Sequence, residues 1–290
     1  MSSFPTNALF HIADLTLEAC DKVTMLSLLD TRLRRLALRC CHNLASVTVD
    51  SSELQAFEYR GSVPEDSFMT MRGASRSSSL MSCKIDICGE EVSSLVELTK
   101  LREFLQLFVD TKHLHLQSAR LGSGLHNDTF IRFQEFSNLR QLEMMGCLPH
   151  DDATIVRAMS RILQQTPELE VLSLVFQPEP EPGDDERLPR GWLKERELLD
   201  VHHLQYNRHD VLGVPSAMIT CLIYRVREIN LVHYQGGRAQ RTLAKFLLCN
   251  GLVLDKLYCG IVPGPLWIHT ELRREIESWA MNKPENRTFC

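Results

Sequence analysis

One short pattern recurs along this chain: an apolar residue, two others, a second apolar residue, one other, and a third apolar residue. It reads "LRRLAL" at residues 33–38 and "LEVLSL" at residues 169–174. The middle apolar residue of each copy falls at position 36, 47, 57, 85, 114, 142, 172, 229 or 257. From position 57 onward the spacing is 28 to 30 residues, apart from one gap of 57 that is close to two repeats. Periods in the twenties are typical of leucine-rich repeats, in which each unit adds one strand to a curved parallel sheet.

The segments between these copies have the period of helices. In "DDATIVRAMSRILQQTP" the apolar residues Ile155, Met159 and Leu163 share one helical face. "RAQRTLAKFLLCNG" has the same property through Leu243 and Phe246. The early copies, only ten or eleven residues apart, leave room for strand, turn and strand alone. We therefore predict an α/β leucine-rich-repeat solenoid, with a curved parallel sheet and with helices and loops on its convex side.

An acidic, proline-rich stretch, one of two that interrupt the repeats, suggests three domains. "QPEPEPGDDERLPRG" alternates proline with acidic residues, which favours an extended and solvated loop. We predict leucine-rich repeats over residues 1–176, an acidic, proline-rich insertion with a polar loop over 177–218, and a C-terminal domain over 219–290 that continues the repeat.

Composition narrows the classes of partner. The formal net charge is −5, so the chain lacks the basic surplus that is typical of nucleic-acid-binding domains. No apolar run approaches the roughly 18 residues that a membrane helix needs, and the first residues do not have the pattern of a secretory signal. The ten cysteines are best interpreted as reduced, small hydrophobic side chains. We expect a cytoplasmic or nuclear protein that binds neither nucleic acid nor membrane.

No familiar catalytic motif is present. The chain contains no G-x-S-x-G, H-E-x-x-H or P-loop pattern. "CCH" at residues 40–42 is an incomplete set of zinc ligands, and "HHLQYNRHD" at 202–210 has no period that would aim its side chains at a metal. We predict a protein that is not an enzyme, with no cofactor and no metal. A metal- or anion-dependent enzyme that uses these cysteines and histidines is the alternative.

The stretch "YQGGRAQR" poses a separate question, because a glycine pair between a strand and a helix can hold a phosphate. It lacks the further glycines and the Lys-Ser/Thr of a P-loop. Arg238, Arg241 and Lys245 share one side of the following helix, and basic residues on such a side are usually solvated. We interpret Gly236-Gly237 as a corner of the fold, with a positive φ among its glycines.

Strand alternation also predicts a binding surface. Residues between and after the inward-facing apolar positions point to the open face of a sheet. These positions mix charges of both signs with hydrogen-bonding groups, which suits the recognition of a protein. The candidate partner-binding residues are Arg39, Asp50, Glu58, Arg60, His115, Gln117, Glu143, Met145, Ser173 and Asn230.

Several segments together resemble a known family. "LRRLALRCCHNLASVTVDSSELQAFEYRG", "FSNLRQLEMMGC", "LEVLSLVF" and "VREINLVHYQGGRAQRTLAKFLLCNGLVLDKLYC" are similar to plant F-box/leucine-rich-repeat proteins with a C-terminal FBD domain, and the grass members are the most similar. The resemblance covers essentially the whole chain, and the last segment is its most specific part.

The resemblance implies a role in protein ubiquitination. In that family an N-terminal F-box binds the Skp-type adaptor of a cullin–RING ubiquitin ligase, and the repeats present a protein substrate. Here the repeat pattern is already under way near "LTL" at residues 15–17, and no "LPxxLL"-like run precedes it. We expect this chain to be the substrate-recognition part of such a protein and not to bind the Skp-type adaptor. A truncated, non-functional fragment is the remaining alternative.

Overall fold

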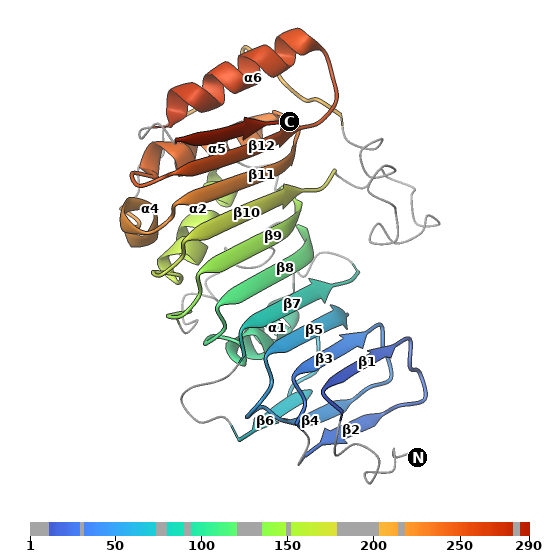
Figure 1. Ribbon diagram of the computed structural model, residues 1–290. Coiled ribbons are helices and arrows are strands. Elements are labelled where there is room, and N and C mark those ends of the chain that lie inside the picture. The colour runs from blue at the N-terminus through green and yellow to red at the C-terminus, as the bar shows by residue number, and fades with distance from the viewer. Residues whose placement is uncertain are drawn as a thin grey trace. The chain divides into compact units, whose positions relative to one another are not determined.

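The computed structural model describes residues 12–29, 32–73, 80–89, 94–120, 135–148, 152–178, 203–213, 218–280 and 285–290. Ten of its strands form one sheet in the order β1-β3-β5-β7-β8-β9-β10-β11-β12-β13, and three more form a sheet in the order β2-β4-β6 (Figure 1). The α/β class and the large parallel sheet are therefore confirmed. The finer prediction of a leucine-rich-repeat solenoid stays a prediction.

The chain divides into two compact units. The first comprises Met1–Ala119 and Ser123–Leu142, and the second comprises Arg120–Gly122 and Glu143–Cys290. The domain boundaries expected from the sequence at residues 176 and 218 stay a prediction. Within the expected insertion, residues 179–202 and 214–217 lie outside the described residues. No helix in the described part of the chain is both long enough and apolar enough to cross a lipid bilayer.

The strands of the first unit alternate between two sheets. The large sheet receives β1 (Asp14–Glu18), β3 (Arg35–Arg39), β5 (Ala56–Gly61), β7 (Ser82–Ile87) and β8 (His113–Arg120). The small sheet receives β2 (Met25–Leu28), β4 (Ser46–Asp50) and β6 (Met69–Arg72). The early copies of the repeat are closely spaced because consecutive strands enter the two sheets alternately. Each early unit is a strand, a turn and a strand, as expected.

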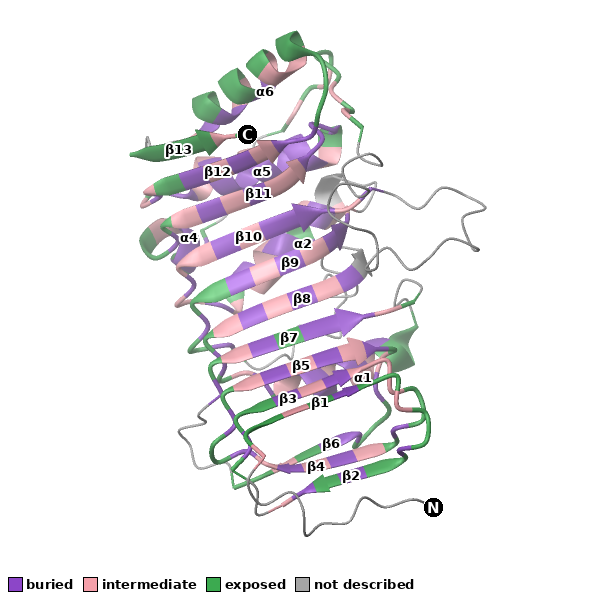
Figure 2. Cartoon of the chain, turned by 45° about the vertical axis from the view of Figure 1, so that its right-hand side comes forward, coloured by how far each residue is buried: buried purple, intermediate pink, exposed green. Residues whose placement is uncertain are grey.

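Apolar residues stack in register across these strands. Leu36 pairs with Phe57, Phe57 with Cys83, and Cys83 with Leu114. All four are at most 5% exposed, and Figure 2 shows buried residues alternating with partly exposed ones along the strands. Because side chains point to opposite faces in turn, this row lies on one face of the sheet and forms the core.

Helix α1 (Leu95–Gln106) closes the core of the first unit. Ser94 caps its N-terminus: Ser94 Oγ accepts from the Glu97 N–H and donates to the Glu97 carboxylate at 2.9 Å. Phe104 and Phe108 then contact Phe57, and the Phe108 and Phe57 rings stack with centroids 5.0 Å apart. Burial of each such side chain contributes about 1.5–3 kcal/mol.

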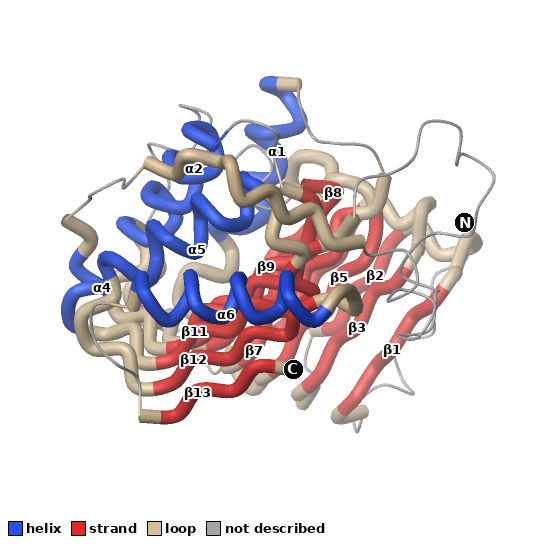
Figure 3. The backbone as a smooth tube through the Cα atoms, turned by 90° about the horizontal axis from the view of Figure 1, so that it is seen from above, coloured by secondary structure: helices blue, strands red, loops and turns tan. Residues whose placement is uncertain are grey.

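The second unit repeats strand and helix. Its strands are β9 (Gln141–Cys147, which begins in the first unit), β10 (Val171–Phe176), β11 (Glu228–Tyr234), β12 (Lys256–Ile261) and β13 (Asn286–Phe289). Its helices are α2 (Asp152–Gln164), α4 (Thr220–Tyr224), α5 (Arg238–Asn250) and α6 (Leu266–Trp279), of which α2 and α5 lie together on one side of the strands (Figure 3). The helices predicted from the two amphipathic segments are confirmed, with Ile155, Met159, Leu163, Leu243 and Phe246 buried.

The glycine pair after β11 is a corner. Gly236 has a φ of +73°, as expected, and a Cβ placed on it would lie 2.7 Å from Leu272 Cδ1. The backbone N–H groups of Gln235 and Gly236 donate to Gln240 Oε1 at 2.6 and 3.1 Å. A phosphate would need those two amide donors, and the Gln240 side chain on α5 already accepts from both of them.

The expectation of an exposed basic side on α5 is wrong for Arg241, whose side chain is 2% exposed. Its guanidinium donates to Glu275 at 2.9 and 2.6 Å, to Asp210 Oδ2 at 3.1 Å and to the Asn207 carbonyl at 2.8 Å, and it lies 4.7 Å from the ring centroid of Tyr206. The physical reason is that the segment 203–213 packs across this face of α5, which helical periodicity alone does not reveal.

Candidate functional site

In the first unit, mostly polar side chains form two rows across the large sheet, on the face opposite the apolar core. Strand register places them at matching positions on neighbouring strands. The first row is Thr16, Ala37, Glu58, Lys84 and His115, and the second row is Glu18, Arg39, Arg60, Asp86 and Gln117.

Ion pairs join the charges of these rows. Arg39 donates to both carboxylate oxygens of Glu58, at 3.0 and 2.8 Å, and lies 3.6 Å from Glu18. Arg60 Nε lies 3.2 Å from Asp86 Oδ2. The hydrogen bond from Arg39 lowers the pKa of Glu58, whereas burial raises the pKa of Asp86 against the opposing charge of Arg60. The charges therefore neutralise one another and hold the side chains in a fixed order.

The second unit carries a different row. Ser173 pairs with Asn230, Asn230 with Tyr258, and Tyr258 with Thr288. Asn230 Nδ2 donates to Ser173 Oγ at 3.0 Å and to Glu228 Oε1 at 3.1 Å. This row is uncharged, with Ser173, Asn230 and Tyr258 half-buried and Thr288 exposed. It therefore offers hydrogen-bonding groups and one aromatic ring.

Most of the predicted surface residues lie where strand alternation places them. The first unit brings together Arg39, Glu58, Arg60, His115 and Gln117. In the second unit Ser173 and Asn230 are neighbours, and Glu143 and Met145 are half-buried on β9. The role of these residues in binding stays a prediction.

Asp50 is the exception, and its placement on the same sheet is wrong. It ends β4, which belongs to the three-stranded sheet, where it pairs in register with Arg72. Its Oδ1 accepts from the Ser52 N–H at 3.0 Å. The cause is the alternation of early strands between two sheets, because repeats ten residues apart cannot all enter the same sheet.

Sequence reasoning also missed members of the surface. Lys84 and Asp86 lie on β7, and Tyr258 lies on β12. The signal for Tyr258 was present, because it stands between the repeat residues Leu257 and Cys259, as Asn230 stands between Ile229 and Leu231. The same alternation therefore places it on the open face.

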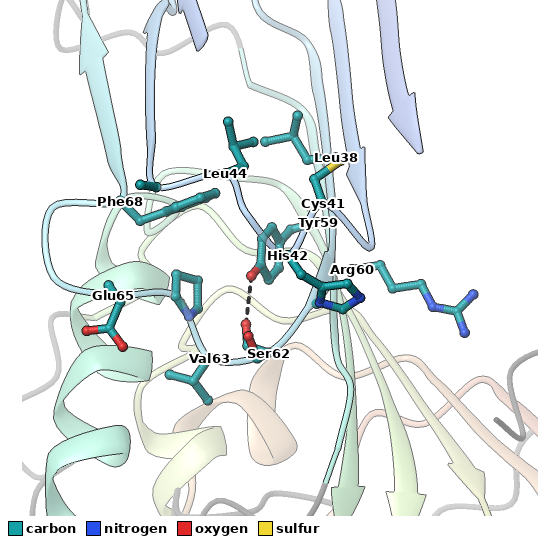
Figure 4. A pocket seen from close by; sticks show the side chains of 13 residues that line it. Leu38, Cys41, His42, Leu44, Tyr59, Arg60, Ser62, Val63, Glu65 and Phe68 are labelled. Atoms are coloured by element: carbon teal, nitrogen blue, oxygen red, sulfur yellow. Dashed lines mark hydrogen bonds between the residues drawn. The ribbon is translucent and has the colours of Figure 1, made fainter. Parts of the chain in front are cut away.

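A cavity of about 260 Å³ lies at the ends of β3 and β5 (Figure 4). Its lining combines Leu38, Leu44 and Phe68 with the polar side chains of Cys41 and His42. The Tyr59 hydroxyl, also in the lining, donates to the Ser62 carbonyl at 2.6 Å.

The chemistry of this cavity is limited. Burial raises the pKa of the Cys41 thiol, so the sulfur stays protonated at neutral pH and is a poor nucleophile. Its Sγ donates to the carbonyls of Leu17 and Arg39. Those bonds anchor the turn after β3 and supply no base for catalysis.

The predicted polar cluster at 202–210 is described from His203 onward, and His202 lies outside the described residues. Within the described ranges, no three His, Cys, Asp or Glu side chains are placed to hold a metal ion. Asp210 instead pairs with Arg241 at 3.1 Å.

The chain was compared with family models, curated proteins and solved structures, and none of them matches it.

Proposed function

We propose that this chain is a noncatalytic protein-interaction module, which binds a protein substrate through the open face of its large sheet. The observation that carries the proposal is the set of register-aligned polar rows on that face, with Arg39, Glu58, Arg60 and Asp86 fixed by ion pairs. Surfaces held in a defined geometry lose less conformational entropy when they bind.

The charge distribution supports a protein as the partner. Each arginine of the second row already pairs with a carboxylate of the same face, at 2.8 Å for Arg39 and at 3.2 Å for Arg60. A nucleic-acid surface would leave basic groups available for phosphates. Mixed charges with interspersed hydrogen-bonding groups instead match the polar surroundings of a protein–protein interface.

The resemblance of the sequence to F-box/leucine-rich-repeat proteins supplies the finer proposal. The parallel strands would be leucine-rich repeats, residues 219–290 would be an FBD domain, and the substrate would enter the ubiquitination pathway. The strand-and-helix alternation of the second unit is compatible with such repeats.

The proposal is tested by capture with matched variants of the full chain. Wild-type protein, Arg39→Gln/Glu58→Gln and Ser173→Ala/Asn230→Ala are immobilised and exposed to plant-cell extract. Arg157→Gln, on the exposed side of α2, serves as the control. Captured proteins are quantified by mass spectrometry, and the melting temperature of every variant is recorded.

We expect at least one protein whose capture falls about tenfold with a face variant, equivalent to about 1.4 kcal/mol, and stays unchanged with the control. Melting temperatures within about 2 °C of wild type would exclude unfolding as the cause. Equal capture by all four proteins would refute recognition by this face.

A further inference from the structure

The open face of β10, β11 and β12 differs in character from that of the first unit. Ser173 and Val175 on β10 lie in register with Asn230 and Val232 on β11, and Asn230 lies in register with Tyr258 on β12. We call these five residues the neutral strip. No helix of the described residues covers it (Figure 2), and its members range from half-buried to 9% exposed in the case of Val175.

The hydrogen bonds of the neutral strip leave an acceptor open. Both Nδ2 hydrogens of Asn230 are engaged, by Ser173 Oγ and by Glu228 Oε1. Its Oδ1 atom accepts no hydrogen bond from any described residue. Glu228 in turn lies 3.5 Å from Lys256 Nζ, so the charges beside the strip are matched. A partner can therefore cover the strip without burying an unpaired charge.

Tyr258 gives the strip its largest apolar surface. A Cβ placed on Gly260 would lie 3.1 Å from the Tyr258 hydroxyl oxygen and 3.4 Å from Cε1, so the ring extends along β12 over the glycine. The missing side chain at position 260 leaves that space to the ring. Tyrosine is one of the residues that most often supply a large share of the binding energy at an interface.

We propose that the neutral strip is where the partner is chiefly held, and that its occupant is an extended, uncharged peptide segment. The segment presents a large apolar side chain to Tyr258 and Val232 and an N–H donor to Asn230 Oδ1. This inference rests on the proposed function and names the chemistry of the bound segment.

Desolvation explains why the strip binds more strongly than the charged rows. Covering Arg39 or Arg60 removes water from charges that already have partners, so the gain in Coulomb energy is small. Covering the neutral strip removes water from valine and tyrosine side chains and satisfies one open acceptor.

The test uses a displayed library of random twelve-residue peptides as its probe, selected on the immobilised full chain. Enriched peptides are synthesised, and their affinities are measured against wild type, Tyr258→Ala, Val232→Lys and Arg39→Gln. Tyr224→Ala is the matched control, because Tyr224 is 68% exposed on α4, away from the sheet face. Melting curves identify any variant that fails to fold.

We expect enriched peptides with an uncharged centre, whose affinity falls at least tenfold with Tyr258→Ala and with Val232→Lys. Arg39→Gln and Tyr224→Ala should leave it within twofold, and raising the salt concentration from about 0.05 to 0.5 M should change it little.

The outcomes separate the two proposals. Charged peptides that depend on Arg39 and on salt would overturn the inference while leaving recognition by the sheet face intact. Peptides that bind all variants equally, or no enrichment over the bare support, would count against both.

Discussion

Replacing Arg241 by methionine removes a buried charge while keeping most of the side-chain volume. The guanidinium links α5 to Glu275 on α6, and to Asp210 and the Asn207 carbonyl in the segment 203–213. The substitution therefore leaves two carboxylates and a carbonyl without the guanidinium that donates to them. It also removes the hydrogen bonds that join α5 to α6 and to the segment 203–213.

The magnitude follows from the exposure of the partners. Removing one member of a buried ion pair costs about 3–5 kcal/mol. The side chains of Asp210 and Glu275 are 15% and 25% exposed. Water can therefore solvate the two carboxylates in part once the guanidinium is gone. We expect a loss of about 3 kcal/mol in the free energy of unfolding. At about 2–4 °C per kcal/mol for a unit of this size, the melting temperature falls by about 6–12 °C.

The assay is chemical and thermal denaturation of the full chain, followed by circular dichroism. Arg238→Met is the control, because Arg238 is exposed at the start of the same helix. Arg241→Lys should be intermediate, since an ammonium keeps the charge but loses the planar fork that binds Glu275. If Arg241→Met and Arg238→Met shift the melting temperature equally, the ion pairs do not hold this corner together.

Four further predictions concern the second unit. Gly236→Ala should destabilise by about 1–2 kcal/mol in urea denaturation, because its φ is positive, whereas Gly213→Ala, with open space around it, should not; equal effects would contradict the geometry. Tyr234→Phe should leave stability unchanged or raise it by about 1–2 kcal/mol, because the buried hydroxyl has no hydrogen-bond partner among the described residues; a clear loss of stability would show a missed partner. In native thiol labelling Cys290 should react first, and Cys221 should stay unreactive, because burial raises its pKa to about 11; rapid labelling in a Cys290→Ser variant would refute this. Since an unfolded thiol ionises near pH 8.5, the folded-state pKa of Cys221 also predicts that stability falls as the pH rises above about 8.5.

Much of the fold follows from local patterns. The strands around Leu36, Phe57, Leu172 and Ile229 form where the apolar repeat predicts them. The reason is that every second side chain of a strand points to the same face of the sheet, so alternating apolar residues all reach the core. Edge strand β13 (Asn286–Phe289) was not predicted, because its residues are exposed or half-exposed and carry no apolar alternation.

The candidate site was predicted less completely. Alternation places Glu58, His115 and Asn230 on a sheet surface, but it cannot identify their hydrogen-bond partners. The Arg39–Glu58 bond joins residues 19 positions apart, and the Asn230–Ser173 bond joins residues 57 apart. Such pairs depend on strand register, which is set by the packing of the whole sheet.

The sequence by itself determined the strands that carry the apolar repeat, the two amphipathic helices α2 and α5, and which side of each one is apolar, because these properties depend on residues a few positions apart. Only the tertiary structure decided that Asp50 belongs to the smaller sheet and that Arg241 is buried between three segments. The reason is physical: the environment of a side chain is set by what packs against its element, and for these two residues the neighbouring elements come from distant parts of the chain.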